Sequence, residues 1–165
     1  MEISELAERY YAGTSERCKA IFSTLFIAAN RLQTLFDHRI PRLTLRQFML
    51  LSIARQPAEP LTLTELGKLL GCSRQNVKKL ALSLEQKGFA RLCRSQYDAR
   101  ALTLVPTETA EEYFRTEFPQ YAGELGTLFS VYSEDEVRTL FELMMRLYAG
   151  LDKLEALTLK GEEEK

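Results

Sequence analysis

The segment from residue 61 to residue 105 constrains the fold of this chain more than any other part of the sequence. Thr62 or Thr64 can cap a short helix whose apolar positions Leu66, Leu69 and Leu70 fall at helical spacing and are expected to share one face. Gly71 is suited to end this helix, because glycine adopts the left-handed conformation of a helix C-cap at little cost. Ser73 can then cap a second helix directly after the turn. The segment therefore predicts two short helices joined by a tight turn.

A hairpin is predicted directly after the second helix. Gly88 is suited to close that helix, and residues 89–105 contain two runs of strand-forming residues around a polar tip at residues 94–100. Helix, turn, helix and hairpin in this order predict a winged helix-turn-helix. The expected fold class is mainly α with a small β-hairpin wing, flanked by N- and C-terminal helices.

The second helix has one apolar face, formed by Val77, Ala81 and Leu84 together with Leu80, and polar side chains elsewhere. Such a helix taken alone is more often just a solvated helix. Gln and Asn, however, can pair with adenine in the major groove, and Lys and Arg can reach guanine or phosphate oxygens. The residues predicted to contact DNA are Ser73, Arg74, Gln75, Asn76, Lys78, Lys79, Lys87, Arg91, Arg94 and Arg100.

The charge distribution favours the nucleic-acid interpretation. Residues 71–105 contain seven Lys and Arg against two Asp and Glu, a net charge of +5, whereas residues 1–70 carry +2 and residues 106–165 carry −8. The formal net charge of the whole chain is only −1. The near-neutral total thus hides a positive region confined to the predicted second helix and wing, as binding to a phosphate backbone requires.

Three motifs, in this order and spacing, resemble the multiple-antibiotic-resistance regulator (MarR) family of winged-helix transcriptional regulators. They are LTLRQFMLL at residues 43–51, LTELGKLLGCSRQNVKKLALSLEQKGFARL at residues 63–92, and the wing motif DARA at residues 98–101. The resemblance implies that Arg100 enters the minor groove. It also implies that Asp98 stabilises the wing by pairing with a basic residue.

The similarity covers residues from about Ser15 to Leu154 and departs from the family pattern after the wing. Family members usually carry Leu-Thr-x-x-Gly there, whereas this chain has Pro106 and Ala110 at the first and last of these positions. Thr107 is kept and is suited to cap the next helix. The junction between the wing and that helix is therefore where this chain differs most from the pattern.

Further helices are predicted on both sides of the helix-turn-helix. Apolar residues fall at helical spacing over residues 15–39, and a second helix is expected over residues 44–54. Beyond the wing, a helix from about Thr107 runs toward Phe129 with an interruption near Pro119. A capping box that begins at Ser133 starts the last helix.

The last helix carries more apolar surface than a small winged core can cover. Pairing with a second copy would cover it and would place two reading helices about one DNA turn, roughly 34 Å, apart on a palindromic operator. The family resemblance implies the same homodimer, although the helix can also pack on its own chain. Residues 1–165 are thus expected to form one domain, with a DNA-binding lobe at 44–105 and dimerisation helices at 1–40 and 107–157. The predicted seam residues are Leu140, Met144, Leu147, Leu151 and Leu154.

The resemblance also implies a repressor that is released by a small aromatic or anionic effector, bound between the dimer helices and the winged lobes. Redox sensing through Cys18 is an alternative, because one branch of the family senses peroxides through a cysteine in its N-terminal helix and Arg17 and Lys19 flank this thiol. Cys18 lies at least a turn from the sensing position, however, which favours an ordinary thiol. His38, the only histidine, is interpreted as a surface residue at a helix end.

Other classes of function are less well supported. The chain has no Ser/His/Asp set, no P-loop and no glycine-rich dinucleotide turn, and its three cysteines lack metal-ligand spacing, so neither an enzyme nor a cofactor nor a metal site is expected. A winged-helix protein-interaction module that binds no DNA is the second alternative, because a fold does not determine a function. A cytoplasmic location is expected, since no cleavable signal or membrane span is apparent.

Overall fold

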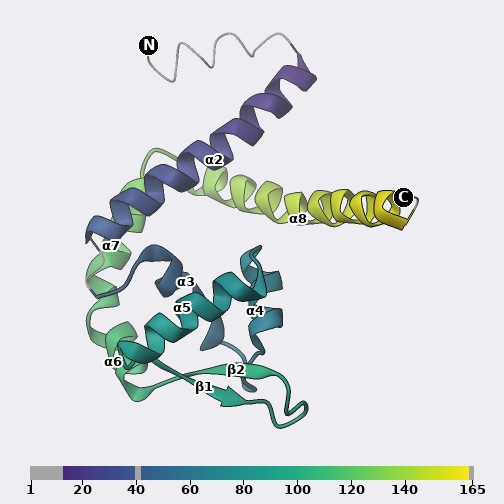
Figure 1. Ribbon diagram of the computed structural model, residues 1–165. Coiled ribbons are helices and arrows are strands. Elements are labelled where there is room, and N and C mark those ends of the chain that lie inside the picture. The colour runs from purple at the N-terminus through teal and green to yellow at the C-terminus, as the bar shows by residue number, and fades with distance from the viewer. Residues whose placement is uncertain (1–12, 40–41, 164–165) are drawn as a thin grey trace. The chain divides into compact units, whose positions relative to one another are not determined.

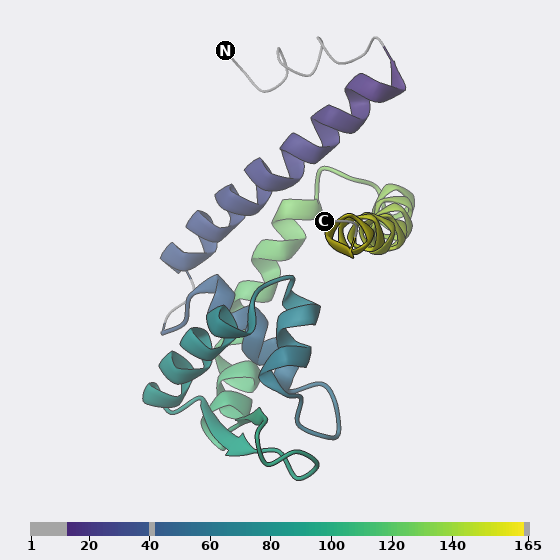
Figure 2. The ribbon, with the colours of Figure 1, turned by 45° about the vertical axis from the view of Figure 1, so that its right-hand side comes forward.

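The computed structural model describes residues 13–39 and 42–163, and it confirms a mainly helical chain with one two-stranded hairpin (Figures 1 and 2). The chain divides into two compact units, the first ending at Arg115 and the second beginning at Thr116. The first unit contains α2 (Thr14–Arg39), α3 (Leu45–Ala54), α4 (Leu63–Leu70), α5 (Arg74–Gln86), β1 (Ala90–Arg94), β2 (Leu102–Pro106) and most of α6 (Glu108–Thr116). The second contains α7 (Phe118–Phe129) and α8 (Glu134–Glu163).

Both helices of the helix-turn-helix begin and end where the sequence predicts. Of the two candidate threonines, Thr62 caps α4: its hydroxyl accepts from the N–H of Glu65 at 3.2 Å, and the Glu65 carboxylate accepts from the N–H of Thr62 at 2.7 Å. Gly71 ends α4 with a φ of 63°. Ser73 caps α5 by accepting from the N–H of Asn76 at 3.3 Å. These local bonds determine where the chain turns from α4 into α5.

The wing is an antiparallel hairpin in which Leu92 pairs with Leu104. Both views show its loop extending away from the other elements of the first unit (Figures 1 and 2). The hydroxyl of Thr107, a candidate cap for α6, donates to the carbonyl oxygen of Gly88 at 2.7 Å. This side chain therefore joins the end of the wing to the turn that precedes it, a role that the sequence did not predict.

We call α3 to α6 with the hairpin, residues 43–115, the winged lobe. Its core contains Leu50, Leu51, Leu63, Leu66, Val77, Leu84, Phe89, Leu104 and Tyr113. Leu63 and Leu66 are the leucines of α4 that pack into the core. Leu69 was expected to share the face of Leu66, but it is 59% exposed, because it lies about 120° from Leu63 around the helix. Tyr113 brings α6 into this core, and the first compact unit ends at Arg115.

A buried amide fixes the C-terminal end of α5 against the start of α3. The Oε1 of Gln47 accepts from the N–H of Thr44 at 3.1 Å and from the Nζ of Lys87 at 2.9 Å, and its Nε2 donates to the hydroxyl of Ser83 at 2.8 Å. Lys87 also donates to the carbonyl oxygen of Arg42 at 2.6 Å. A buried polar group that loses its partner costs about 1–3 kcal/mol, so this network resists rotation of α5.

Helix α2 is attached to α3 through polar side chains. Asp37 accepts from the N–H of Leu45 at 2.5 Å, and the Nε of Arg46 donates to the Oε1 of Gln33 at 3.2 Å. Within residues 14–39 no side chain is buried, and the large exposed apolar residues are Ile21, Phe22, Phe26, Ile27 and Leu35. The remaining residues of the predicted N-terminal dimerisation segment, 1–12 and 40, lie outside the described residues.

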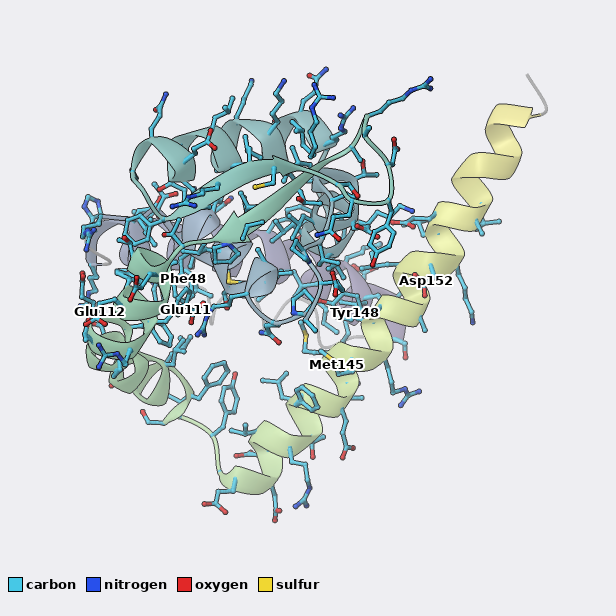
Figure 3. The ribbon with its side chains drawn as sticks, turned by 90° about the horizontal axis from the view of Figure 1, so that it is seen from below. Phe48, Glu111, Glu112, Met145, Tyr148 and Asp152 are labelled. Atoms are coloured by element: carbon cyan, nitrogen blue, oxygen red, sulfur yellow. The ribbon has the colours of Figure 1, made fainter. Side chains whose placement is uncertain are left out.

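Arg55 links α3 to α6. Its Nη2 lies 2.5 Å from the Oε2 of Glu111, and its guanidinium stacks 4.3 Å from the ring centroid of Phe114, which also contacts Phe48. Figure 3 labels Phe48 and Glu111. The hydrogen bond from Arg55 is the main reason that the pKa of Glu111 is lowered from its ordinary value. A lowered carboxyl pKa stabilises the folded state above the unfolded pKa, and this contribution is lost as the pH falls through the folded pKa.

We expect Glu111→Gln to reduce the free energy of unfolding by at most about 1 kcal/mol near neutral pH, because the pair is partly exposed. The difference from the wild type should shrink as the pH falls through the lowered folded pKa of Glu111, and should vanish once the carboxyl group is protonated in the folded protein too. Urea unfolding over a series of acidic pH values measures this. The control is Glu112→Gln, which removes the more exposed pair with Arg115 on the same helix. A difference between Glu111→Gln and wild type that persists in acid would contradict this account.

The second unit consists of two helices. The predicted interruption near Pro119 is confirmed, because α6 ends at Thr116 and α7 begins at Phe118. The capping box at Ser133 is also confirmed: its hydroxyl accepts from the N–H of Glu136 at 3.4 Å, and its own N–H donates to the Glu136 carboxylate at 2.8 Å. Among the helices that the structure describes, none is long and apolar enough to cross a membrane.

Candidate nucleic-acid interface

Helix α5 is anchored by one face and presents the other to solvent. Val77, Ala81 and Leu84 are buried in the winged lobe. Because these residues occupy one side of the helix, the side chains between them point outward, and Figure 3 shows nitrogen-tipped side chains projecting from α5. The structure thus places the predicted reading residues together on one exposed surface: Arg74, Gln75, Asn76, Lys78 and Lys79.

The wing adds exposed arginines to this surface. Arg91 lies on β1, Arg94 ends it and Arg100 lies in the loop, and all are exposed. The guanidinium of Arg94 donates to the carbonyl oxygen of Ala99 at 3.0 Å, so it braces the loop from one side. Arg91 and Arg100 are therefore the wing cations best placed to meet a phosphate backbone.

Asp98 stabilises the loop through the backbone. Its Oδ1 accepts from the N–H of Arg100 at 2.8 Å, and its carbonyl oxygen accepts from the N–H of Ala101 at 2.9 Å. The family resemblance implies a basic side chain as its partner; in the structure, Asp98 and the side chains of Arg74 and Arg100 line one hollow of about 230 Å³. This hollow joins the N-terminal end of α5 to the wing.

Lys87, predicted to contact DNA, makes contacts within the protein. Its ammonium donates to Gln47 and to the carbonyl oxygen of Arg42, as described above. Replacing it would disturb the packing of α5 as well as remove a charge. Arg91 is therefore the cleaner position for testing contacts with the DNA backbone.

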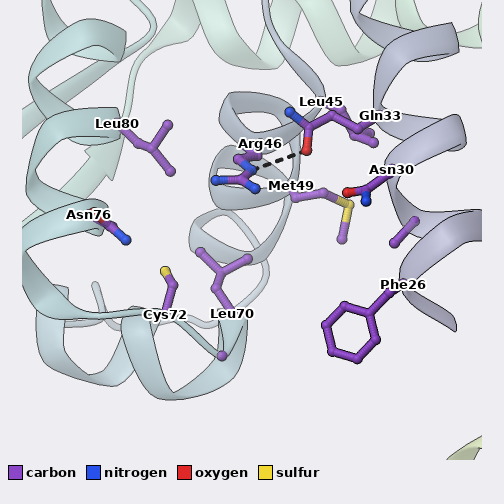
Figure 4. A pocket seen from close by; sticks show the side chains of 12 residues that line it. Phe26, Asn30, Gln33, Leu45, Arg46, Met49, Leu70, Cys72, Asn76 and Leu80 are labelled. Carbon is purple, nitrogen blue, oxygen red and sulfur yellow. Dashed lines mark hydrogen bonds between the residues drawn. The ribbon is translucent and has the colours of Figure 1, made fainter. Parts of the chain in front are cut away.

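A cavity of about 580 Å³ lies beside the N-terminal half of α5 (Figure 4). Asn76 and Leu80 of α5 extend toward it from one side, and Phe26 and Asn30 of α2 lie on the other. Between them, Arg46 is held by Gln33. The predicted reading residue Asn76 is thus shared between the exposed surface of α5 and the wall of this cavity.

Cys18, the candidate for redox sensing, and the histidine of the chain lie away from this cavity. Cys18 and His38 are exposed on α2, and neither lines the cavity. The ammonium of Lys19, beside Cys18, pairs with Glu16 at 2.7 Å. The cysteine that does line the cavity is Cys72, in the turn before α5, and its sequence position gave no sign of this.

The predicted dimerisation residues share one stripe of α8. Met144, Leu147, Leu151 and Leu154 are exposed and Leu140 is partly covered. Figure 3 labels three further residues, Met145, Tyr148 and Asp152, whose side chains stand out from the same helix.

One exposed residue of the wing was not singled out from the sequence. Tyr97 lies at the tip of the loop between Arg94 and Arg100 and is 86% exposed. An aromatic residue inside an otherwise polar turn was the available signal, because folding alone gives no reason to place a ring there.

Comparison with known proteins places these features in context. Residues 43–101 match the model of the MarR family. The chain is 31% identical over 139 residues to the transcriptional repressor MprA of Escherichia coli K12, an alignment that covers 84% of this chain and 67% of MprA.

Two solved structures show the same fold. The MarR/EmrR family transcriptional regulator of Acinetobacter sp. ADP1 aligns with a TM-score of 0.70 and 17% identity, over 82% of this chain and 96% of that one. MepR of Staphylococcus aureus, solved as a complex with DNA, aligns with a TM-score of 0.68 and 19% identity, over 79% of this chain and 97% of that one. At these identities the similarity concerns the fold.

Proposed function

Because this chain belongs to the MarR family of transcriptional regulators, we propose that it binds a palindromic DNA operator as a homodimer and represses transcription. The observation that carries the proposal is the exposed surface formed by α5 and the wing, where amide and basic side chains lie together. Two comparisons support the proposal: MprA is named a transcriptional repressor, and the structure of MepR was determined in complex with DNA. We place this activity in the cytoplasm, where the DNA of the bacteria that carry MprA and MepR is found.

The two parts of the surface suit different parts of DNA. Gln75 and Asn76 lie in the first turn of α5, which in helix-turn-helix proteins contacts base edges in the major groove. Arg91 and Arg100 suit the phosphates and the minor groove beside it, since a narrow minor groove attracts arginine. The helix supplies sequence preference, and the wing supplies affinity and sensitivity to groove shape.

A homodimer would supply the second reading helix. The stripe on α8 and the exposed apolar residues of α2 leave more apolar surface in contact with water than a monomeric protein usually carries. Pairing of two chains would cover this surface. Two linked lobes also bind a palindrome far more tightly than one lobe binds a half-site, because the second contact forms at high effective concentration.

The cavity beside α5 is the site we propose for a small effector. Phe26 and Met49 give it apolar walls, and Arg46 and Asn30 give it polar groups, which suits an aromatic or anionic molecule. An effector that bound there would contact both α2 and α5 and would favour an arrangement of the lobes that fits the operator poorly. Cys18 does not line this cavity, so the cavity gives no support to the alternative of redox control.

Selection of duplexes from a random pool tests the proposal directly, followed by a titration of the selected duplex. A dimer that enriches a palindrome is the expected result. A protein that retains no duplex preferentially would favour the interaction-module alternative. Adding candidate aromatic acids to the selected complex then tests release, for which Arg46→Ala is the matched cavity variant.

Two substitutions should separate base reading from backbone binding. We expect Gln75→Ala to weaken the selected duplex by about 1–3 kcal/mol while binding to random duplex hardly changes, because a bidentate base contact is lost. Arg91→Ala should weaken both duplexes alike and lower the slope of log affinity against log salt concentration by about one, because one phosphate contact is lost. Equal losses on both duplexes for Gln75→Ala would remove its base-reading role.

A further inference from the structure

The tip of the wing carries an aromatic ring that the fold does not use. Tyr97 is 86% exposed, the largest exposed fraction among the large hydrophobic residues that the structure describes. Exposing an aromatic ring to water forfeits the stabilisation that burial would provide. The loop that bears the ring extends away from the other elements of the first unit, so the ring is available to a partner (Figures 1 and 2).

The backbone around Tyr97 is held by hydrogen bonds within the loop. The hydroxyl of Ser95 accepts from the N–H of Tyr97 at 3.2 Å and from the N–H of Asp98 at 3.4 Å. The N–H of Ser95 donates to the carbonyl oxygen of Ala101 at 3.0 Å, which closes the loop. A tip that is already ordered loses little conformational entropy when it binds, so its ring can contribute more to affinity.

The charges beside the ring indicate what it meets. Arg94 and Arg100 flank Tyr97 on the two sides of the loop, and Asp98 is the only acidic residue among positions 90–107. A protruding basic loop is drawn to phosphates, and apolar side chains that enter a minor groove between two phosphate rows pack on sugars and base edges. The net charge of +5 over residues 71–105 extends this positive region from the wing to α5, which favours a phosphate backbone as the partner.

We infer that Tyr97 is a further DNA-contacting residue, whose ring packs against deoxyribose and base edges in the minor groove beside Arg100. The inference rests on the proposed function, since it concerns the same complex with DNA. The contact is apolar and tolerant of sequence, because every nucleotide presents a sugar. It adds affinity without adding to the number of phosphates that the wing neutralises.

Affinity and salt dependence together test this contact on the duplex selected from the random pool. Tyr97→Ala should weaken binding about tenfold with an unchanged salt slope, because no charge is lost. Tyr97→Phe should bind within about twofold of wild type, because the ring is kept. Arg100→Ala is the matched comparison: it should weaken binding and also lower the slope by about one.

Fluorescence gives a second readout. The chain has no tryptophan, so Tyr97→Trp places a single indole at the wing tip. Its emission should be quenched by acrylamide in the protein alone and protected once the selected duplex is bound.

The possible outcomes separate the role of Tyr97 from the proposed binding of DNA by the whole protein. If Tyr97→Ala binds the selected duplex with wild-type affinity while Arg100→Ala binds it more weakly, Tyr97 has no role in the contact, but the proposed function still holds. A Tyr97→Phe variant as weak as Tyr97→Ala would assign the contact to the hydroxyl group and would equally overturn ring packing. If the wild-type protein selects no duplex, the proposed function fails and this inference fails with it.

Discussion

Leu147→Glu is expected to separate the two protomers and to abolish operator binding. Leu147 lies in the middle of the stripe on α8 and is exposed in the single chain, so the substitution leaves the fold of each protomer intact. In the proposed dimer it would bury two uncompensated carboxylates, which costs about 3 kcal/mol or more of association, over 100-fold in the dissociation constant. Sedimentation and a titration of the selected duplex measure both effects.

Ala149→Glu is the matched control for this experiment. Ala149 lies on the same helix about 200° around from Leu147, so the added charge is the same but points away from the stripe. It should remain dimeric and bind the duplex normally. A folded Leu147→Glu monomer that still binds the full palindrome as tightly as wild type would mean that α8 does not pair the reading helices.

Gly67→Ala is expected to have the second largest effect, through the geometry of the helix-turn-helix. A Cβ atom at Gly67 would lie 2.7 Å from the carbonyl oxygen of Cys72, a backbone atom that cannot move aside alone. The N–H of Cys72 also donates to the carbonyl oxygen of Gly67 at 2.9 Å, so the turn is held closely against α4. We expect a loss of about 1–3 kcal/mol in the free energy of unfolding and a larger loss of duplex affinity, because α5 must shift.

Whether Gly67→Ala lowers or raises the free energy of unfolding distinguishes a steric clash from helix propensity as the dominant effect. Alanine is the better helix former by about 1 kcal/mol, so helix propensity alone predicts that Gly67→Ala stabilises the protein. Gly126→Ala in α7 is the control, since the added Cβ meets no atom within 4 Å beyond its chain neighbours and the nearby backbone of its own helix, and a small gain in stability is expected there. Urea unfolding of both variants decides the matter: a Gly67→Ala protein as stable as Gly126→Ala would show that the turn has room to adjust.

The features that sequence reasoning predicted well depend on residues close together in the chain. The caps at Ser73 and Ser133 and the left-handed glycine at Gly71 each follow from a few neighbouring residues. The hairpin and the break near Pro119 follow from local propensity in the same way. The family resemblance then added the expected roles of Asp98 and Arg100 in the wing and supported the expected homodimer.

The features that it missed depend on residues far apart in the chain. Lys87 was predicted as a DNA contact from its charge and its place after α5, but its partner Gln47 lies forty residues earlier. The bond from Thr107 to Gly88 likewise spans nineteen residues. Leu69 was expected inward because its spacing from Leu66 is helical, and only the direction of the actual core shows that Leu63 takes that place.

The position of Asn76 has a consequence for how such a regulator would treat different operators. Its amide lines the cavity and also lies on the exposed surface of α5, so a ligand that engages it there competes with a base edge for the same donor and acceptor. Linkage between two ligands is reciprocal, so the operator must weaken the ligand by the same factor by which the ligand weakens the operator. Operators that take no contact from Asn76 would escape this competition, so they would need a higher ligand concentration to be cleared than the others. One base position per half-site would then be enough to rank promoters by their sensitivity to a single signal.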